Sequence, residues 1–170
     1  MRLIIADAGP LIIFAKSDKL WIVRELASEI IITGTVMMEC TSDAAKPGAI
    51  TIINAVKEGI IQVVVDPTIP DILAKIPIDD GEKSTIAYAM RYKNPNSVLI
   101  DEVSGRRVAS KLGLNMIGSS GILLAAKKNG VIGAVEPILD EWKSLGYRLN
   151  EDLIQRVMAM AGESRTCKPK

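Results

Sequence analysis

Two short apolar runs, each ending at an aspartate, constrain most strongly what this chain can fold into. Residues 3–6 read Leu-Ile-Ile-Ala before Asp7, and residues 98–100 read Val-Leu-Ile before Asp101. Continuous apolar runs of this length are typical of strands buried in a parallel sheet. Parallel strands end at one edge of the sheet, where open α/β folds build their sites, so we expect the two aspartates to lie at that edge.

Short β-branched runs alternate with longer segments of helical period along most of the chain. This alternation predicts a parallel sheet with helices on both faces. The core must be mainly aliphatic, because 48% of the residues are hydrophobic and only 4% are aromatic. We expect strands at 2–7, 29–33, 60–65, 97–101 and 114–117, and helices at 10–16, 18–27, 35–40, 47–58, 80–92, 104–112, 118–129, 133–145 and 150–161.

The length of the chain and its apolar segments bound its class. A chain of 170 residues is expected to form one domain with a full core. The first apolar run is too short for a signal peptide and no segment is long enough to span a bilayer, so we expect a soluble, cytoplasmic protein. Cys40 and Cys167 are the only cysteines, and we expect no structural disulfide between them.

The chain contains no histidine. This removes the commonest general base, the Ser-His-Asp triad and every zinc site that uses histidine. The formal net charge of +1 neither favours nor excludes a polyanionic partner. Any chemistry must therefore depend largely on carboxylates.

Four acidic residues are the candidates for that chemistry: Asp7, Glu39, Glu82 and Asp101. Each also has an ordinary structural explanation. Asp7 fits the N-cap of a helix, and Asp79 with Glu82 three residues later fits a capping box. Glu39 fits an exposed helix position, and Asp101 fits an acidic turn before a basic helix. No single one of these positions identifies a site.

Three or four carboxylates gathered at one place would repel one another by several kcal/mol. A hard divalent cation relieves this repulsion, and Mg²⁺ and Mn²⁺ both prefer oxygen ligands. Such a centre indicates phosphodiester hydrolysis that needs no protein nucleophile.

The acidic segments and their order resemble those of PIN-domain proteins. The segments that carry the resemblance are Asp7-Ala8-Gly9-Pro10-Leu11-Ile12, Ile78-Asp79-Asp80-Gly81-Glu82 and Val98-Leu99-Ile100-Asp101-Glu102. The continuation from Ile117 to Lys127, and the later segment 137–141, are similar to a prokaryotic branch of predicted nucleic-acid-binding PIN-like proteins. The resemblance covers residues 3–162.

The resemblance implies a three-layer α/β/α sandwich with a central parallel sheet of about five strands. The PIN-like nuclease domain is expected at 1–162, followed by a polar C-terminal tail at 163–170. The implied activity is that of an endoribonuclease that depends on Mg²⁺ or Mn²⁺ and hydrolyses single-stranded or structured RNA. The related toxin-type ribonucleases pair with an antitoxin protein, which makes an antitoxin an expected partner.

The same resemblance assigns roles to individual residues. Asp7, Glu82 and Asp101 match the catalytic acids of the family. Together with Glu39 and Glu102 they form the expected set of metal ligands. Ser119 matches a Ser or Thr that often contacts the site, and is expected to bind substrate.

Arg106 and Arg107 are further candidates for substrate binding. They lie on the predicted helix that leaves the acidic edge after Asp101, where they could bind the phosphates beside the scissile bond. The ordinary explanation is a solvated basic helix face. Few aromatic residues are present for base stacking, so recognition of the RNA sequence is expected to be weak.

Two positions depart from the family pattern. Glu102 stands where many members carry an aspartate, and Ser120 replaces a larger apolar residue. Both departures leave the choice between one and two metal ions open.

A catalytically silent PIN-fold module that binds RNA or another protein is the alternative function.

The apolar helices expected at 133–145 and 150–161 extend past the last strand. Part of their surface is expected to cover the sheet and part to form a symmetric homodimer. Their large apolar residues are Trp142, Leu145, Leu149, Leu153, Ile154 and Val157.

Overall fold

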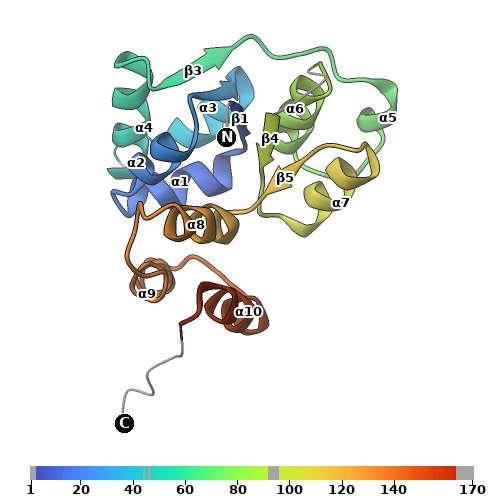
Figure 1. Cartoon of the computed structure of the whole chain (residues 1–170). Helices are drawn as coiled ribbons and strands as arrows, with labels where there is room; N and C mark the ends of the chain where they lie inside the picture. Colours follow the sequence, from blue (N-terminus) through green and yellow to red (C-terminus); the bar gives the residue numbers. More distant parts are fainter. Residues whose placement is uncertain (1–2, 44, 46, 92–95, 164–170) are drawn as a thin grey trace.

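The computed structural model describes residues 3–43, 45, 47–91 and 96–163 (Figure 1). The strands are β1 (Leu3–Ala6), β2 (Glu29–Thr33), β3 (Ile61–Val64), β4 (Asn96–Leu99) and β5 (Met116–Ile117). The helices are α1 (Ala8–Lys16), α2 (Leu20–Leu26), α3 (Gly34–Thr41), α4 (Pro47–Lys57), α5 (Asp71–Ala74), α6 (Asp80–Ala89), α7 (Val103–Lys111), α8 (Ser119–Lys128), α9 (Glu136–Ser144) and α10 (Glu151–Ala161).

The strands form one parallel sheet in the order β3-β2-β1-β4-β5, which confirms the predicted fold class. All five expected strands and all nine expected helices are present, with small shifts at their ends. Positions 2 and 92 of those predictions, and the tail at 164–170 with Cys167, lie outside the described residues. The structure adds α5, whose four residues after Pro70 are too few to show a helical period.

Successive strand residues point to opposite sides of the sheet, and β1 and most of β2 are buried on both faces, whereas Gln62 and Val63 of the edge strand β3 are exposed. On β1, Ile4 and Ala6 join the core beneath α1, α2, α4 and α8. Leu3 and Ile5 join a second core beneath α5, α6 and α7. The molecule is therefore a three-layer sandwich, as Figure 1 shows.

The chain reverses its direction across the sheet at β1. It builds outward from β1 through β2 to β3, and then returns to the opposite side of β1 to form β4 and β5. Asp7 follows β1 directly, and its backbone N–H donates to the Leu99 carbonyl at the end of β4 at 2.9 Å. Connections leave the carboxyl ends of β1 and β4 toward opposite faces, so these ends border the crevice of a doubly wound sheet.

The C-terminal helices α9 and α10 form an outer layer next to α8 (Figure 1). Trp142, Ile154 and Val157 are buried in the core beneath α8. The other three apolar residues expected at a dimer surface, Leu145, Leu149 and Leu153, pack partly buried against the same core. These side chains therefore serve the internal packing of this chain, and the homodimer stays a prediction.

A carboxylate that follows α10 caps the N-terminus of α9. Glu163 accepts hydrogen bonds from the backbone N–H groups of Val135 at 2.8 Å and Glu136 at 2.9 Å, and from the Lys127 ammonium at 2.6 Å. Burial acts in the opposite direction, but these donors together hold the pKa of Glu163 below its ordinary value. Glu163 thus joins α8, α9 and the end of α10.

Among the described residues, no helix combines the length and the apolar character needed to cross a bilayer.

Replacing Glu163 by alanine should lower the free energy of unfolding by about 2 kcal/mol at pH 7, because two backbone donors and one ammonium lose their acceptor. A carboxyl group whose pKa is lower in the folded state stabilises the fold at pH values above its unfolded pKa, which is about 4.3. This stabilisation is lost as the pH falls. The difference from wild type should therefore shrink below about pH 4. Urea unfolding at pH 7 and pH 3.5 measures this difference in stability, and the variant Glu25→Ala at an exposed position is the control. A urea midpoint of Glu163→Ala equal to that of the control at pH 7 would contradict the capping role of Glu163.

Candidate metal centre

The centre begins at Asp7, between β1 and α1. Asp7 occupies the N-cap position of α1, yet its side chain makes no capping hydrogen bond of the usual kind. The side chain is buried, and its Oδ1 atom has no hydrogen-bond partner among the residues that the structure describes. A buried, unpaired carboxylate oxygen is costly, so simple helix capping does not explain Asp7.

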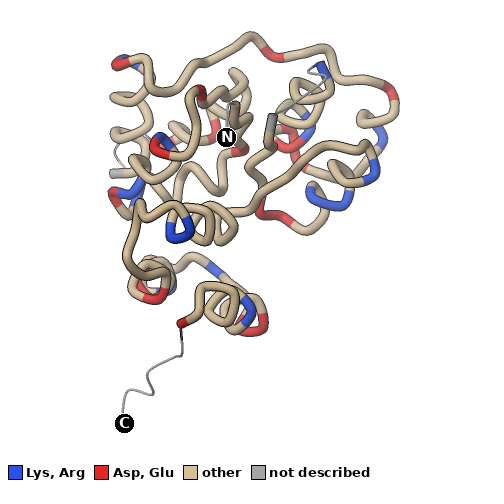
Figure 2. Tube along the Cα trace, viewed as in Figure 1, with Lys and Arg blue, Asp and Glu red and all other residues tan. Residues whose placement is uncertain are grey.

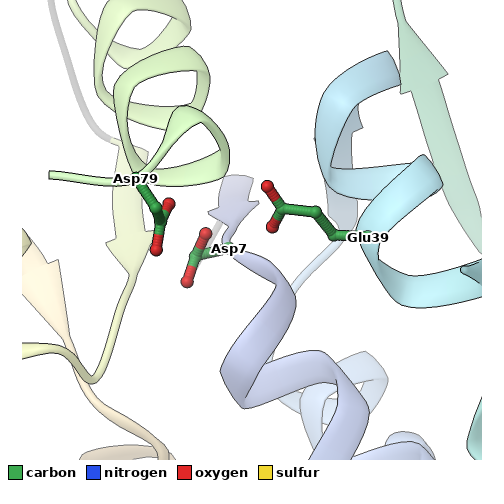
Figure 3. Close-up of side chains that lie close together, drawn as sticks. All are labelled: Asp7, Glu39 and Asp79. Atoms are coloured by element: carbon green, nitrogen blue, oxygen red, sulfur yellow. The ribbon is translucent and has the colours of Figure 1, made fainter.

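Two further carboxylates converge on Asp7 from different elements. Glu39 projects from α3 and Asp79 from the N-terminus of α6, and the three side chains point toward one another in Figure 3. One carboxylate oxygen from each residue lies within 4.8 Å of the other two. Residues far apart in the sequence thus form one compact group of oxygen donors.

Glu82 lies in the first turn of α6, three residues after Asp79. It completes a capping box with Asp79: the Glu82 N–H donates to Asp79 at 2.7 Å, and the Asp79 N–H donates to Glu82 over a longer 3.4 Å. The predicted capping box is therefore confirmed. Capping uses one Glu82 oxygen. The other, Oε1, lies against the backbone of Gly105 and makes no hydrogen bond of normal geometry among the described residues, although Glu82 is 1% exposed.

Asp101 lies at the carboxyl end of β4 and is held by donors from two other segments. Its Oδ1 accepts the Ser119 N–H at the start of α8 at 2.8 Å. Its Oδ2 accepts the hydroxyls of both Ser119 and Tyr147. Asp101 thus keeps a fixed orientation next to the centre, without joining the three-residue group.

The other residues predicted for the site differ in how deeply they are buried. Glu102 is exposed at the N-cap of α7, and its charge acts on Glu82. Arg106 is half-buried and donates to the Ile100 carbonyl at 3.1 Å, whereas Arg107 is exposed. Ser119 is fully buried. Figure 2 shows the Lys and Arg positions gathered along α7, next to the acidic positions where that helix begins.

Two glycines let the backbone approach these carboxylates closely. A Cβ atom at Gly81 would lie 2.8 Å from Glu39 Oε1, closer than any Cβ contact tolerates. A Cβ atom at Gly105 of α7 would overlap Glu82 Oε1. The absence of a side chain at both positions therefore leaves room for the acidic groups.

The negative charges of the centre repel one another. Burial first, and then the charge of Asp79, raise the pKa of Asp7 to about 7. The same two causes raise the pKa of Glu82 to about 7, and they also raise the pKa of Glu39. Two unit charges about 5 Å apart repel by about 3 kcal/mol at an effective dielectric of 20, so without a cation the site favours bound protons.

The donor set fits a hard divalent cation. It consists of carboxylate oxygens of Asp7, Glu39 and Asp79, and Asp7 Oδ1 is buried without a hydrogen-bond partner among the described residues. Mg²⁺ and Mn²⁺ prefer such ligands and need only a few of them, because both keep bound water. A sulfur ligand is not indicated, since burial raises the pKa of the nearby Cys40 thiol to about 12.

The sequence places Asp79 in a capping box and in a segment that resembles the family, but does not predict it as a metal ligand. The structure shows that Asp79 has both roles, because one of its oxygens caps α6 while the side chain also contributes to the acidic group. Tyr147 was not singled out at all. Its position in a loop 46 residues beyond Asp101 carries no local signal of that contact.

Fold and centre together define a class: a doubly wound α/β domain with an acidic, oxygen-only site at the point where the strand order reverses. A sequence model of the family described as PIN domain matches residues 3–163. The chain therefore belongs to the PIN-domain family, as its resemblance predicted. The comparison with curated proteins gives no match. PIN domains are typically nucleases that use a divalent metal, and the acidic group is compatible with that activity.

Metal binding should grow stronger as pH rises from 6 to 8. The raised pKa values near 7 mean that a cation must displace protons from Asp7 and Glu82 below neutrality. Without metal, acids with a raised folded pKa favour the folded state at low pH, and this stabilisation is lost as pH rises through about 7. Mn²⁺ should therefore increase the melting temperature more at pH 8 than at pH 6.

Differential scanning calorimetry with and without about 1 mM Mn²⁺, roughly 1,000 times a dissociation constant of about 1 μM, measures this effect. Asp79→Asn is the matched variant and should show a much smaller increase at pH 8. Equal increases at the two pH values in wild type would contradict the proton-linked site.

Proposed function

We propose that this protein is an endoribonuclease that depends on Mg²⁺ or Mn²⁺ and hydrolyses phosphodiester bonds of single-stranded RNA. The observation that carries the proposal is the convergence of Asp7, Glu39 and Asp79 within 4.8 Å, with a buried Asp7 oxygen left unpaired. Membership of the PIN-domain family supports a nuclease in general. The RNA substrate and the choice of metal are part of the proposal.

Asp7, Glu39 and Asp79 would hold the cation, with Glu82, Asp101 and the more exposed Glu102 around them. When bound, such a cation supplies an activated water and stabilises negative charge on the phosphate. The protein's own part is to bring these carboxylates together and to orient them, and the bound cation favours their ionised forms. A deprotonated carboxylate at this site also accepts a proton from an attacking water.

Basic residues beside the centre would position the substrate backbone. Arg106 uses one donor on the Ile100 carbonyl, which keeps its guanidinium near Asp101 while further N–H donors stay available for a phosphate. The exposed Arg107 would contact a more distant phosphate. Ser119 is buried against Asp101, so its effect on substrate would pass through that carboxylate.

A cavity of about 370 Å³ adjoins the centre and offers room for part of the substrate. Glu39 lies on its wall, together with Ile12, Lys16 and Ala49. Its surface is mainly apolar, with Lys16 as its cation and Glu39 and Asp43 as its acids, which suits a sugar or a base more than a phosphate. We infer that a nucleotide flanking the scissile bond occupies this cavity.

The finer biological roles rest on family resemblance. A toxin role with an antitoxin partner, and a homodimer, stay predictions. The alternative function is a silent PIN-fold module that binds RNA or protein without cleaving RNA. The two functions differ in turnover and in their dependence on metal.

Asp7→Asn should reduce cleavage of a labelled single-stranded RNA more than about 100-fold in Mg²⁺ or Mn²⁺, because it removes a negative ligand while keeping the shape of the side chain. Asparagine caps helices about as well as aspartate, so the circular dichroism spectrum should stay native. A gel assay of the cleavage products measures the rate. The exposed Asp140→Asn on α9 serves as the matched control and should cleave like wild type.

Wild-type rates in Asp7→Asn would refute the assignment of Asp7. A wild-type protein that binds the RNA without cleaving it in either metal would favour the silent module instead.

A further inference from the structure

Three of the six aromatic residues of this chain form one chain of ring contacts that ends at the acidic edge. Phe14 of α1 and Trp142 of α9 pack edge to face, with centroids 5.0 Å apart and planes at 88°. Trp142 in turn packs edge to face on Tyr147, at 5.6 Å and 74°. The rings therefore hold Tyr147 in place by a favoured geometry.

The indole of Trp142 is fixed in addition by a polar contact. Its Nε1–H donates to the Ser17 hydroxyl at 3.0 Å, and that hydroxyl donates to the Ile13 carbonyl at 2.8 Å. Trp142 is fully buried. The C-terminal segment is thus attached to α1 through Trp142, two residues before the end of α9, and this attachment sets the position of the Tyr147 ring.

At the other end, the Tyr147 hydroxyl donates to Asp101 Oδ2, which also accepts from Ser119. A carboxylate oxygen accepts about two hydrogen bonds, so these donors occupy Oδ2. Oδ1 accepts only the Ser119 N–H in the described structure, which leaves it with capacity for one further partner.

We propose that Tyr147 is a positioning residue for Asp101: its hydroxyl fixes the carboxylate so that Oδ1 is the oxygen offered to the cation or to its bound water. This inference rests on the proposed function and adds a contribution of the C-terminal helices to the centre. The alternative is that Tyr147 only fills space beneath Trp142.

Tyr147→Phe separates these two roles, because it keeps the ring and its contact with Trp142 but removes the hydroxyl. Partners that orient a metal ligand typically contribute 10-fold to 100-fold in metal affinity or activity. The variant should therefore bind Mn²⁺ about 10-fold to 100-fold more weakly, and the Mn²⁺ concentration for half-maximal RNA cleavage should rise by a similar factor. The KM for RNA at saturating Mn²⁺ should change little.

Isothermal titration with Mn²⁺ at pH 8 and RNA cleavage over a range of Mn²⁺ concentrations measure these effects. Tyr88→Phe removes a hydroxyl from α6 at the end far from Asp79, and serves as the matched control with wild-type affinity. Ser119→Ala should weaken Mn²⁺ binding in the same direction, and the double variant should lose less than the product of the two factors, since both hydroxyls serve one oxygen.

Unchanged Mn²⁺ affinity in Tyr147→Phe would overturn the inference and leave only the packing role. Tighter binding would overturn it too, because the hydroxyl would then compete with the cation. If the wild type binds Mn²⁺ but cleaves no RNA, the proposed function fails. Weaker Mn²⁺ binding by Tyr147→Phe would then still support the role of Tyr147 in positioning Asp101. A wild type that binds neither Mn²⁺ nor Mg²⁺ would refute both.

Discussion

The pairing of β1 between β2 and β4 is the constraint on which the rest of the structure depends. β1 is buried on both faces and is paired in parallel on both edges. Asp7 follows this strand directly, so its carboxylate enters the protein interior at the crevice between diverging connections. The α3 and α6 helices then place Glu39 and Asp79 against it.

This arrangement gathers negative charge around the buried carboxylates of Asp7 and Glu82, with Glu39 partly buried and Asp79 exposed. The unpaired oxygen of Asp7 and the raised pKa values of Asp7 and Glu82 are consequences of that burial. A fold selected only for stability would replace such groups or pair them. Their presence beside glycines that leave room for them is compatible with a divalent cation at the site.

The C-terminal helices connect stability with the centre. Glu163 joins α8, α9 and the end of α10 through charge-assisted hydrogen bonds. Within the same segment, Trp142 attaches to α1 and Tyr147 reaches Asp101. Helices that lie outside the sheet therefore contribute to the orientation of an acid at its edge.

The sequence by itself determined the α/β class, the five strands and the candidates Asp7, Glu39, Glu82 and Asp101. These properties follow from local patterns, namely apolar runs, helical periods and acidic residues at element ends. Only the tertiary structure decided which oxygens meet: Asp79 joins Asp7 and Glu39, whereas Asp101 is held by Ser119 and Tyr147. The physical reason is that a capping box has the same sequence pattern whether or not another carboxylate lies opposite it. Contacts between residues far apart in the sequence depend on how whole helices pack.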